Sequence, residues 1–136
     1  MANDCIFCKI IEGKIPCAKV YENDKIIAFL DISPVNPGHV LVMSKQHFER
    51  LEDLPDEILC ELAKAIKKIS KAVLKAVNAG SFNLGVNDGR AAGQLVPHAH
   101  FHIMPRFEGD GLKHWPGKSY EEGEAEKIAE NIRKNI

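Results

Sequence analysis

The sequence predicts an α+β fold in which an antiparallel sheet is combined with one long helix and a short N-terminal helix. Two observations support this class. Short apolar segments typical of strands occur in both halves of the chain, and one long segment between them has helical periodicity. The predicted order is therefore a short helix, strands, a long helix and further strands, which favours an antiparallel sheet. With 136 residues, the chain is expected to form a single domain, 1–136, whose core needs no disulfides.

The short helix is expected at residues 5–12, where apolar residues share one side. Four segments before the histidine-rich region are expected to be strands: 18–23, 26–32, 39–45 and 82–88. Asn23 and Asp24 form the turn between the first two strands. The segment SPVNPGH contains two prolines and a glycine and is therefore a loop.

The long helix is predicted from apolar residues that recur every three or four positions: Ile58, Leu62, Ile66, Ile69, Val73 and Val77. We expect Asp53 to cap its N-terminus, Pro55 to lie in its first turn, and the segment NAG after Val77 to end it. Cys60 is expected to be a small buried residue of this helix. The tail, about 119–136, is expected to form a weaker and mostly exposed helix outside the main fold.

Composition and charge exclude several classes of protein. The net charge is −1 and no basic run stands alone, so a nucleic acid polymer is not expected as a partner. No segment approaches the ~20 apolar residues of a membrane span, and the N-terminus does not have the pattern of a signal peptide. We therefore expect a cytoplasmic protein with no membrane association. Its four cysteines should then be reduced or metal-bound.

The segment VPHAHFHIMPR, residues 96–106, contains three of the six histidines of the chain. Its period of two predicts a half-buried strand, with Ala99, Phe101 and Ile103 on one face and His98, His100 and His102 on the other. Histidines two positions apart lie about 7 Å from each other on such a face. They could share one phosphate-sized ligand, or they could belong to a metal site of the His-x-His kind.

Three blocks resemble the histidine triad (HIT) family: GQLVPHAHFHIM, AFLDISPVNPGHVLVMSKQH and CIFCKIIEGKIP. They follow in the family's order over about residues 4–116. The resemblance implies cleavage at the α-phosphate of a purine nucleotide, by hydrolysis or nucleotidyl transfer, through a covalent nucleotidyl-histidine. It also implies a homodimer in which two sheets join into one.

Carried over by position, the resemblance makes His100 the nucleophile and gives His102 a contact with the phosphate. A neutral imidazole is a good nucleophile near pH 7 and also a good leaving group. The positions that match substrate-binding residues of the family are Asp31 for the ribose, His39, Asn87 and Gln94 near the phosphate, and Ile6, Phe7, Ile10, Phe29 and Ile32 for the base. For His39, a purely structural role at a strand start is an equal alternative, and each apolar residue could simply belong to the core.

Two positions near the triad bear on its chemistry. Leu95 follows the Gly-Gln pair where many relatives have Ser or Thr, so a hydroxyl near the phosphate is missing. Pro97 removes a backbone donor just before the triad. The sequence therefore does not decide which leaving group the protein accepts. Two segments point to different classes: HIMPRFEGDG resembles the dinucleoside polyphosphate hydrolases, whereas KHWPG resembles the nucleoside phosphoramidases.

Cys5 and Cys8 form a Cys-x-x-Cys pair, which is typical of half of a zinc site or of a redox pair. The resemblance implies structural Zn²⁺ with His47 and His98 as the remaining ligands, so that the first triad histidine would bind metal rather than phosphate. Two further hypotheses remain for the whole chain. One is a non-catalytic purine-nucleotide sensor or scaffold, and the other is a metal-binding module with metal at the triad itself.

Overall fold

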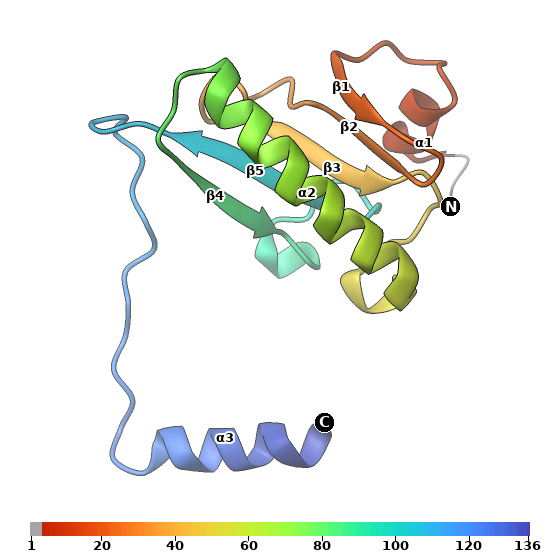
Figure 1. Ribbon diagram of the computed structural model, residues 1–136. Helices are drawn as coiled ribbons and strands as arrows, with labels where there is room; N and C mark the ends of the chain where they lie inside the picture. Colours follow the sequence, from red (N-terminus) through yellow and green to blue (C-terminus); the bar gives the residue numbers. More distant parts are fainter. Residues whose placement is uncertain (1–3) are drawn as a thin grey trace.

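The sheet has five antiparallel strands, with one helix packed against each of its faces (Figure 1). This computed structural model describes residues 4–136. The strands are β1 (Lys19–Glu22), β2 (Ile26–Leu30), β3 (Val40–Ser44), β4 (Ser81–Val86) and β5 (His100–Arg106), in the order β1-β2-β3-β5-β4. The helices are α1 (Ile6–Ile11), α2 (Asp56–Ala76) and α3 (Glu124–Asn135), with 3-10 turns at Leu51–Asp53 and Arg90–Ala92. The α+β class is confirmed.

The central strands separate the histidines from the main core. In the pairing of β3 with β5, Met43 lies opposite His100 and Val42 lies opposite Phe101. Because paired residues point to the same face, His100 lies on the α1 side of the sheet and Phe101 on the α2 side. The apolar layer between α1 and the sheet is formed by residues from both: Cys5, Phe7, Cys8, Ile27, Phe29, Leu41 and Met43.

β5 is shorter than the predicted strand, because it begins at His100 and leaves His98 in a bend. The N–H of His98 donates to the carbonyl of Val96 at 2.8 Å, and the N–H of Ala99 donates to the carbonyl of Phe48 at 2.7 Å. These bonds keep the segment from pairing with β3 as strand. The prediction of three histidines on one strand is therefore wrong for His98.

Helix α2 confirms the predicted periodicity but begins later than expected. Leu62, Ile66, Ile69 and Val73 are buried against the sheet. Pro55 is the N-cap, and the carboxylate of Asp53 instead accepts from the N–H of Arg50 at 3.1 Å in the preceding 3-10 turn. The prediction of Asp53 as the cap is therefore wrong. The prediction that Cys60 is buried is also wrong, because this residue lies on the exposed side of the helix.

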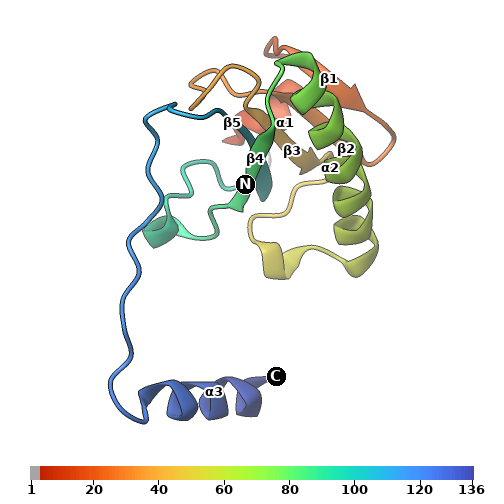
Figure 2. The same ribbon diagram turned by 60° about the vertical axis from the view of Figure 1, so that its left-hand side comes forward.

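The C-terminal part of the chain leaves the end of β5 and runs away from the sheet in both views (Figures 1 and 2). It ends in α3, which buries none of its residues, as the sequence predicted for an exposed helix. Ile128 and Ile132 lie four residues apart on α3 and are 40% and 56% exposed. None of the helices within residues 4–136 has the length and apolar character needed to cross a bilayer.

Candidate active site

His100 is a buried side chain at the centre of the histidine cluster, with the ring of Phe7 edge-on at 5.0 Å. Its Nδ1 lies 2.7 Å from the carbonyl oxygen of His98. A carbonyl only accepts hydrogen bonds, so Nδ1 carries the ring proton and the neutral imidazole keeps its lone pair on Nε2. Burial lowers the pKa of His100, which keeps the ring neutral.

His39 and His102 are joined by a hydrogen bond of 2.9 Å between Nε2 of His39 and Nδ1 of His102. The N–H of Val35 donates to Nδ1 of His39 at 3.1 Å, so the proton of neutral His39 is on Nε2. His39 therefore donates to His102, whose own proton must lie on Nε2. Burial lowers the pKa of His39 and brings that of His102 to about 4, so both rings are neutral at pH 7.

Nε2 of His102 is a buried donor without a hydrogen-bond partner in residues 4–136. A buried polar group of this kind costs free energy unless a ligand satisfies it. Its ring centroid lies 5.0 Å from that of His100. The cluster therefore combines a nucleophilic nitrogen with an unused N–H donor, which is what an attack on a phosphate requires.

The residues predicted to contact the nucleoside lie on the same face of the sheet or at its end. Phe7 and Phe29 are buried, with ring centroids 5.6 Å apart. Asp31 follows β2, and its Oδ1 accepts from the N–H of Ser33 at 2.8 Å, which leaves Oδ2 3.6 Å from Nε2 of His39. Ile32 is 97% exposed, so it is free to contact a base but forms no part of the core.

The loop between β4 and β5 is stabilised by Gln94. Its Oε1 accepts from the N–H of Gly89 at 2.8 Å, and its Nε2 donates to the carbonyls of Glu49 at 2.8 Å and Val96 at 3.1 Å. The side chain of Gln94 thus holds the loop, and its backbone remains the part that could reach a phosphate. Leu95, the next residue, is 92% exposed.

Asn87 follows β4 directly, and its amide lies beside Gly93 in this loop. Next to Asn87, Asp88 forms an ion pair with Arg50 that the sequence did not predict, and its carboxylate also accepts from the N–H of Leu51 at 2.9 Å. Their positions in the sequence, 38 residues apart, carry no local pattern that would have predicted the contact.

Cys5, Cys8, His47 and His98 form a second cluster, whose ligand atoms all lie within 4.8 Å of one another. Nδ1 of His98 lies 3.6 Å from the sulfur of Cys5 and 3.6 Å from that of Cys8, and Nδ1 of His47 lies 3.3 Å from the sulfur of Cys8. A tetrahedral zinc site has sulfur–nitrogen separations of about 3.5 Å. The four residues therefore fit such an ion.

The protonation of His98 also suits metal binding. Its Nε2 donates to the carbonyl of Ser44 at 2.8 Å, which leaves the lone pair of Nδ1 facing the two sulfurs. Without an ion, burial raises the pKa of the Cys8 thiol to about 11. A cation is what would stabilise the thiolate in this buried place.

Residues 12–109 match the HIT domain family. The chain belongs to the HIT family. A HIT-like protein of Methanocaldococcus jannaschii is 53% identical over 107 residues, which cover 79% of this chain and 82% of the relative. Adenosine 5'-monophosphoramidase hnt1 of Schizosaccharomyces pombe is 40% identical, with 97% and 98% covered. Adenylylsulfatase HINT3 of Arabidopsis thaliana is 39% identical, with 100% and 71% covered.

Solved HIT structures share the fold. A HIT family protein from Bacillus subtilis superposes with a TM-score of 0.90 at 40% identity, over 98% of this chain and 97% of that one. A protein from Streptococcus mutans UA159 gives 0.93 at 39% identity, over 98% and 86%. A zinc-bound histidine triad family protein from Mycobacterium smegmatis gives 0.78 at 32% identity, with both chains covered completely.

Proposed function

We propose that this HIT protein cleaves purine nucleotides at the α-phosphate, by hydrolysis or nucleotidyl transfer, through a nucleotidyl-histidine at His100. The observation that carries the proposal is the hydrogen bond from Nδ1 of His100 to the carbonyl of His98, because it leaves a lone pair on Nε2. The names of the relatives, an adenosine 5'-monophosphoramidase and an adenylylsulfatase, support adenylate as the transferred group.

The reaction would proceed in two displacements. Nε2 of His100 attacks the α-phosphorus, the bond from phosphorus to the leaving group breaks, and the leaving group takes a proton. Water or another acceptor then attacks the phosphorus and releases a proton to the solvent, which balances the proton that the leaving group took up, while the phosphorus–nitrogen bond breaks and returns neutral His100. The N–H of His102 would bind a phosphate oxygen in both steps, and Asn87 together with the backbone near Gln94 would add further donors.

The nucleoside would bind beside the end of β2. The carboxylate of Asp31 can accept from ribose hydroxyls. The base would lie against Phe7, Phe29 and Ile32. His39 would act indirectly, because its Nε2 donates to His102 and is therefore not free to contact the phosphate.

We also propose that the cluster of Cys5, Cys8, His47 and His98 holds structural zinc. Its sulfur–nitrogen separations support the assignment, and so does the zinc-bound relative from Mycobacterium smegmatis. When bound, the ion would join α1 to the start of β5. Since the carbonyl of His98 also accepts the hydrogen bond from Nδ1 of His100, the ion would fix the backbone on which the nucleophile depends.

A homodimer is the proposed assembly. Leu84 on the edge strand β4 is 49% exposed, and α3 has an apolar side that none of residues 4–136 buries. Residues 107–136 form more than a fifth of the chain, so TM-scores of 0.90 and 0.93 require the tails of those solved structures to superpose as well. A tail held in this extended position in several proteins is consistent with packing against a second copy. Light scattering would test the assembly.

The test of the proposed function is intact-protein mass spectrometry after quenching without acid. Wild type and His100→Ala are each mixed briefly with adenosine 5'-phosphoramidate and, separately, with diadenosine triphosphate. We expect an adenylate adduct on wild type alone, and the compound that loads it identifies the leaving group. Binding of AMP without adduct or product from either compound would favour a nucleotide sensor instead.

A further inference from the structure

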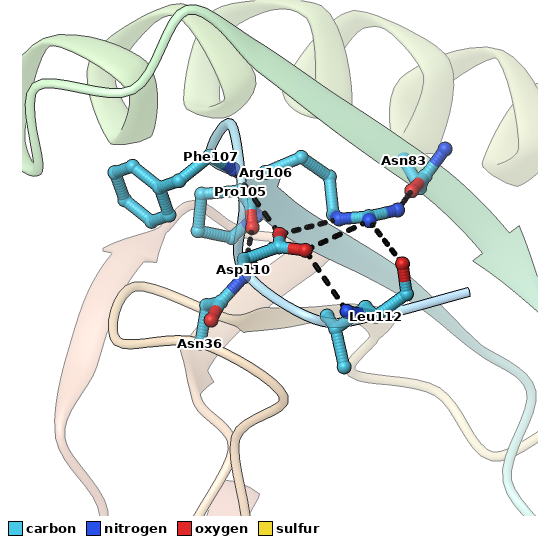
Figure 3. A network of polar contacts seen from close by, with 7 residues as sticks. All are labelled: Asn36, Asn83, Pro105, Arg106, Phe107, Asp110 and Leu112. Atoms are coloured by element: carbon cyan, nitrogen blue, oxygen red, sulfur yellow. Dashed lines mark hydrogen bonds and ion pairs between the residues drawn. The ribbon is translucent and has the colours of Figure 1, made fainter. Parts of the chain in front are cut away.

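Asp110 is the centre of a polar network at the end of β5 (Figure 3). Its carboxylate accepts from Nε and Nη2 of Arg106 at 2.8 and 3.0 Å, and from the N–H groups of Phe107 at 3.2 Å and Leu112 at 3.0 Å. Arg106 above all lowers the pKa of Asp110, so the carboxylate is charged at neutral pH. A fifth hydrogen bond, from Nδ2 of Asn36 at 3.1 Å, comes from a distant part of the chain.

Asn36 attaches the loop of residues 31–39 to this network. Its Nδ2 donates both to Asp110 and to the carbonyl of Pro105, at 2.9 Å. Its own carbonyl accepts from the N–H of His39 at 3.1 Å. The side chain of Asn36 therefore fixes the backbone between Val35 and His39 relative to β5, the strand that carries His102.

The hydrogen bond from His39 to His102 has a strong competitor. Nε2 of His39 lies 2.9 Å from Nδ1 of His102 but also 3.6 Å from the carboxylate of Asp31. A hydrogen bond to a carboxylate is about twice as strong as one between neutral groups, so a freely turning His39 would donate to Asp31. The position of the His39 ring therefore makes it donate to His102 rather than to Asp31. The hydrogen bond from the N–H of Val35 to Nδ1 of His39 holds the ring in that position.

We propose that Asn36 and Asp110 are positioning residues that hold His39 on His102 and thereby keep the proton of His102 on Nε2, where it meets the phosphate. The functional part of this inference rests on the proposed function. If the loop loosens, His39 turns to Asp31 and Nδ1 of His102 loses its donor. The proton of His102 then distributes between its two nitrogens, and the fraction of molecules with a donor toward the phosphate falls.

The test compares Asn36→Ala with Asn83→Ala in the full-length protein. Asn83 accepts from Nη1 of Arg106 at 2.7 Å, so its loss disturbs the same network without touching the loop. Nitrogen-15 NMR of the histidine rings reports the tautomer of His102 in the absence of any ligand. We expect a single tautomer, protonated on Nε2, in wild type and Asn83→Ala, and a mixture of tautomers in Asn36→Ala.

Asn36→Asp keeps the shape of the side chain but removes the donor, so it should resemble Asn36→Ala. Asp110→Asn should move the tautomer in the same direction, and circular dichroism identifies any variant that fails to fold. We expect kcat for adenosine 5'-phosphoramidate to fall about tenfold in Asn36→Ala, and by less than about twofold in Asn83→Ala.

An unchanged tautomer in Asn36→Ala, or an equal change in Asn83→Ala, would overturn the inference. A shifted tautomer together with inactive wild type would instead refute the proposed function, because the NMR measurement needs no turnover.

Discussion

A Cβ atom built on Gly38 would stand only 2.8 Å from Cγ1 of Val77, at the point where the loop of residues 31–39 crosses the end of α2. The φ angle of Gly38 is +98°, which side-chain-bearing residues rarely adopt. Both facts restrict the position to glycine. The loop that carries Asp31 and ends at His39 therefore depends on a glycine that packs against the end of α2.

Gly38→Ala should destabilise the protein by about 2–4 kcal/mol, because it combines backbone strain with a clash against Val77. Urea unfolding measures the change. Gly80→Ala is the matched control, since nothing lies within 4 Å of its Cβ and it should change stability by less than about 1 kcal/mol. Compared with Val77→Ala alone, the double variant Gly38→Ala/Val77→Ala should lose less free energy of unfolding than Gly38→Ala loses in wild type. The difference measures the clash, and the remaining loss measures the backbone strain. Equal stabilities of the two single variants would show that the loop tolerates the side chain.

Metal removal should destabilise the protein. At a free zinc concentration 1,000 times the Kd, binding contributes about 4 kcal/mol, which a chelator would remove. We expect metal analysis to find one zinc per chain in wild type and much less in Cys5→Ser and His47→Ala. Cys17→Ser and Cys60→Ser change exposed thiols outside the cluster and serve as controls. Full stability and activity after complete zinc removal would contradict a structural role.

The stability of the folded chain should fall as the pH drops from about 6.5 to about 4, in part because of His102. Burial first, and then the neighbouring His100 and His39, lower its pKa from 6.5 to about 4, while Asp31 acts in the opposite direction. In that interval the unfolded state binds more protons than the folded state, so the free energy of unfolding rises with pH and levels off above about 6.5.

Unfolding curves at several pH values measure this dependence. His102→Asn should have a flatter profile between pH 4 and 6.5 than wild type. His114→Asn changes an exposed histidine and should leave the profile as it is. A wild-type profile in His102→Asn would mean that His102 does not carry the effect.

Much of the fold follows from local patterns. The period of two predicts which side chains share a face of β5, with His100 and His102 on one and Phe101 and Ile103 on the other, because strand geometry fixes the alternation. The periodicity of α2 predicts its buried side for the same reason. The spacing of Cys5 and Cys8 alone marked half of a metal site, whereas His47 and His98 were assigned through the resemblance to the HIT family, and the structure brings all four together.

Two of the misses come from contacts between distant parts of the chain, and a third comes from a competing local hydrogen bond. Asn36 and Asp110 are 74 residues apart, and neither has a local pattern that marks it. Asp53 was a good candidate for a cap by local chemistry, but its carboxylate is taken by the N–H of Arg50. His98 leaves the strand because its neighbour Ala99 bonds to Phe48, a partner that the sequence does not reveal.

Leu95→Ser should change catalysis without changing stability. Leu95 is 92% exposed, so its replacement should alter the free energy of unfolding by no more than about 0.5 kcal/mol. The residue lies in the loop held by Gln94, and a hydroxyl there would add a donor near the phosphate or leaving group. One such hydrogen bond is worth about 1 kcal/mol, which corresponds to a rise of roughly fivefold in kcat/KM for adenosine 5'-phosphoramidate. Leu95→Ala removes the same bulk without supplying a hydroxyl, so it should leave kcat/KM within about twofold of wild type. If both variants gained equally, the effect would come from the space that Leu95 occupies, and the hydroxyl would have no part in it.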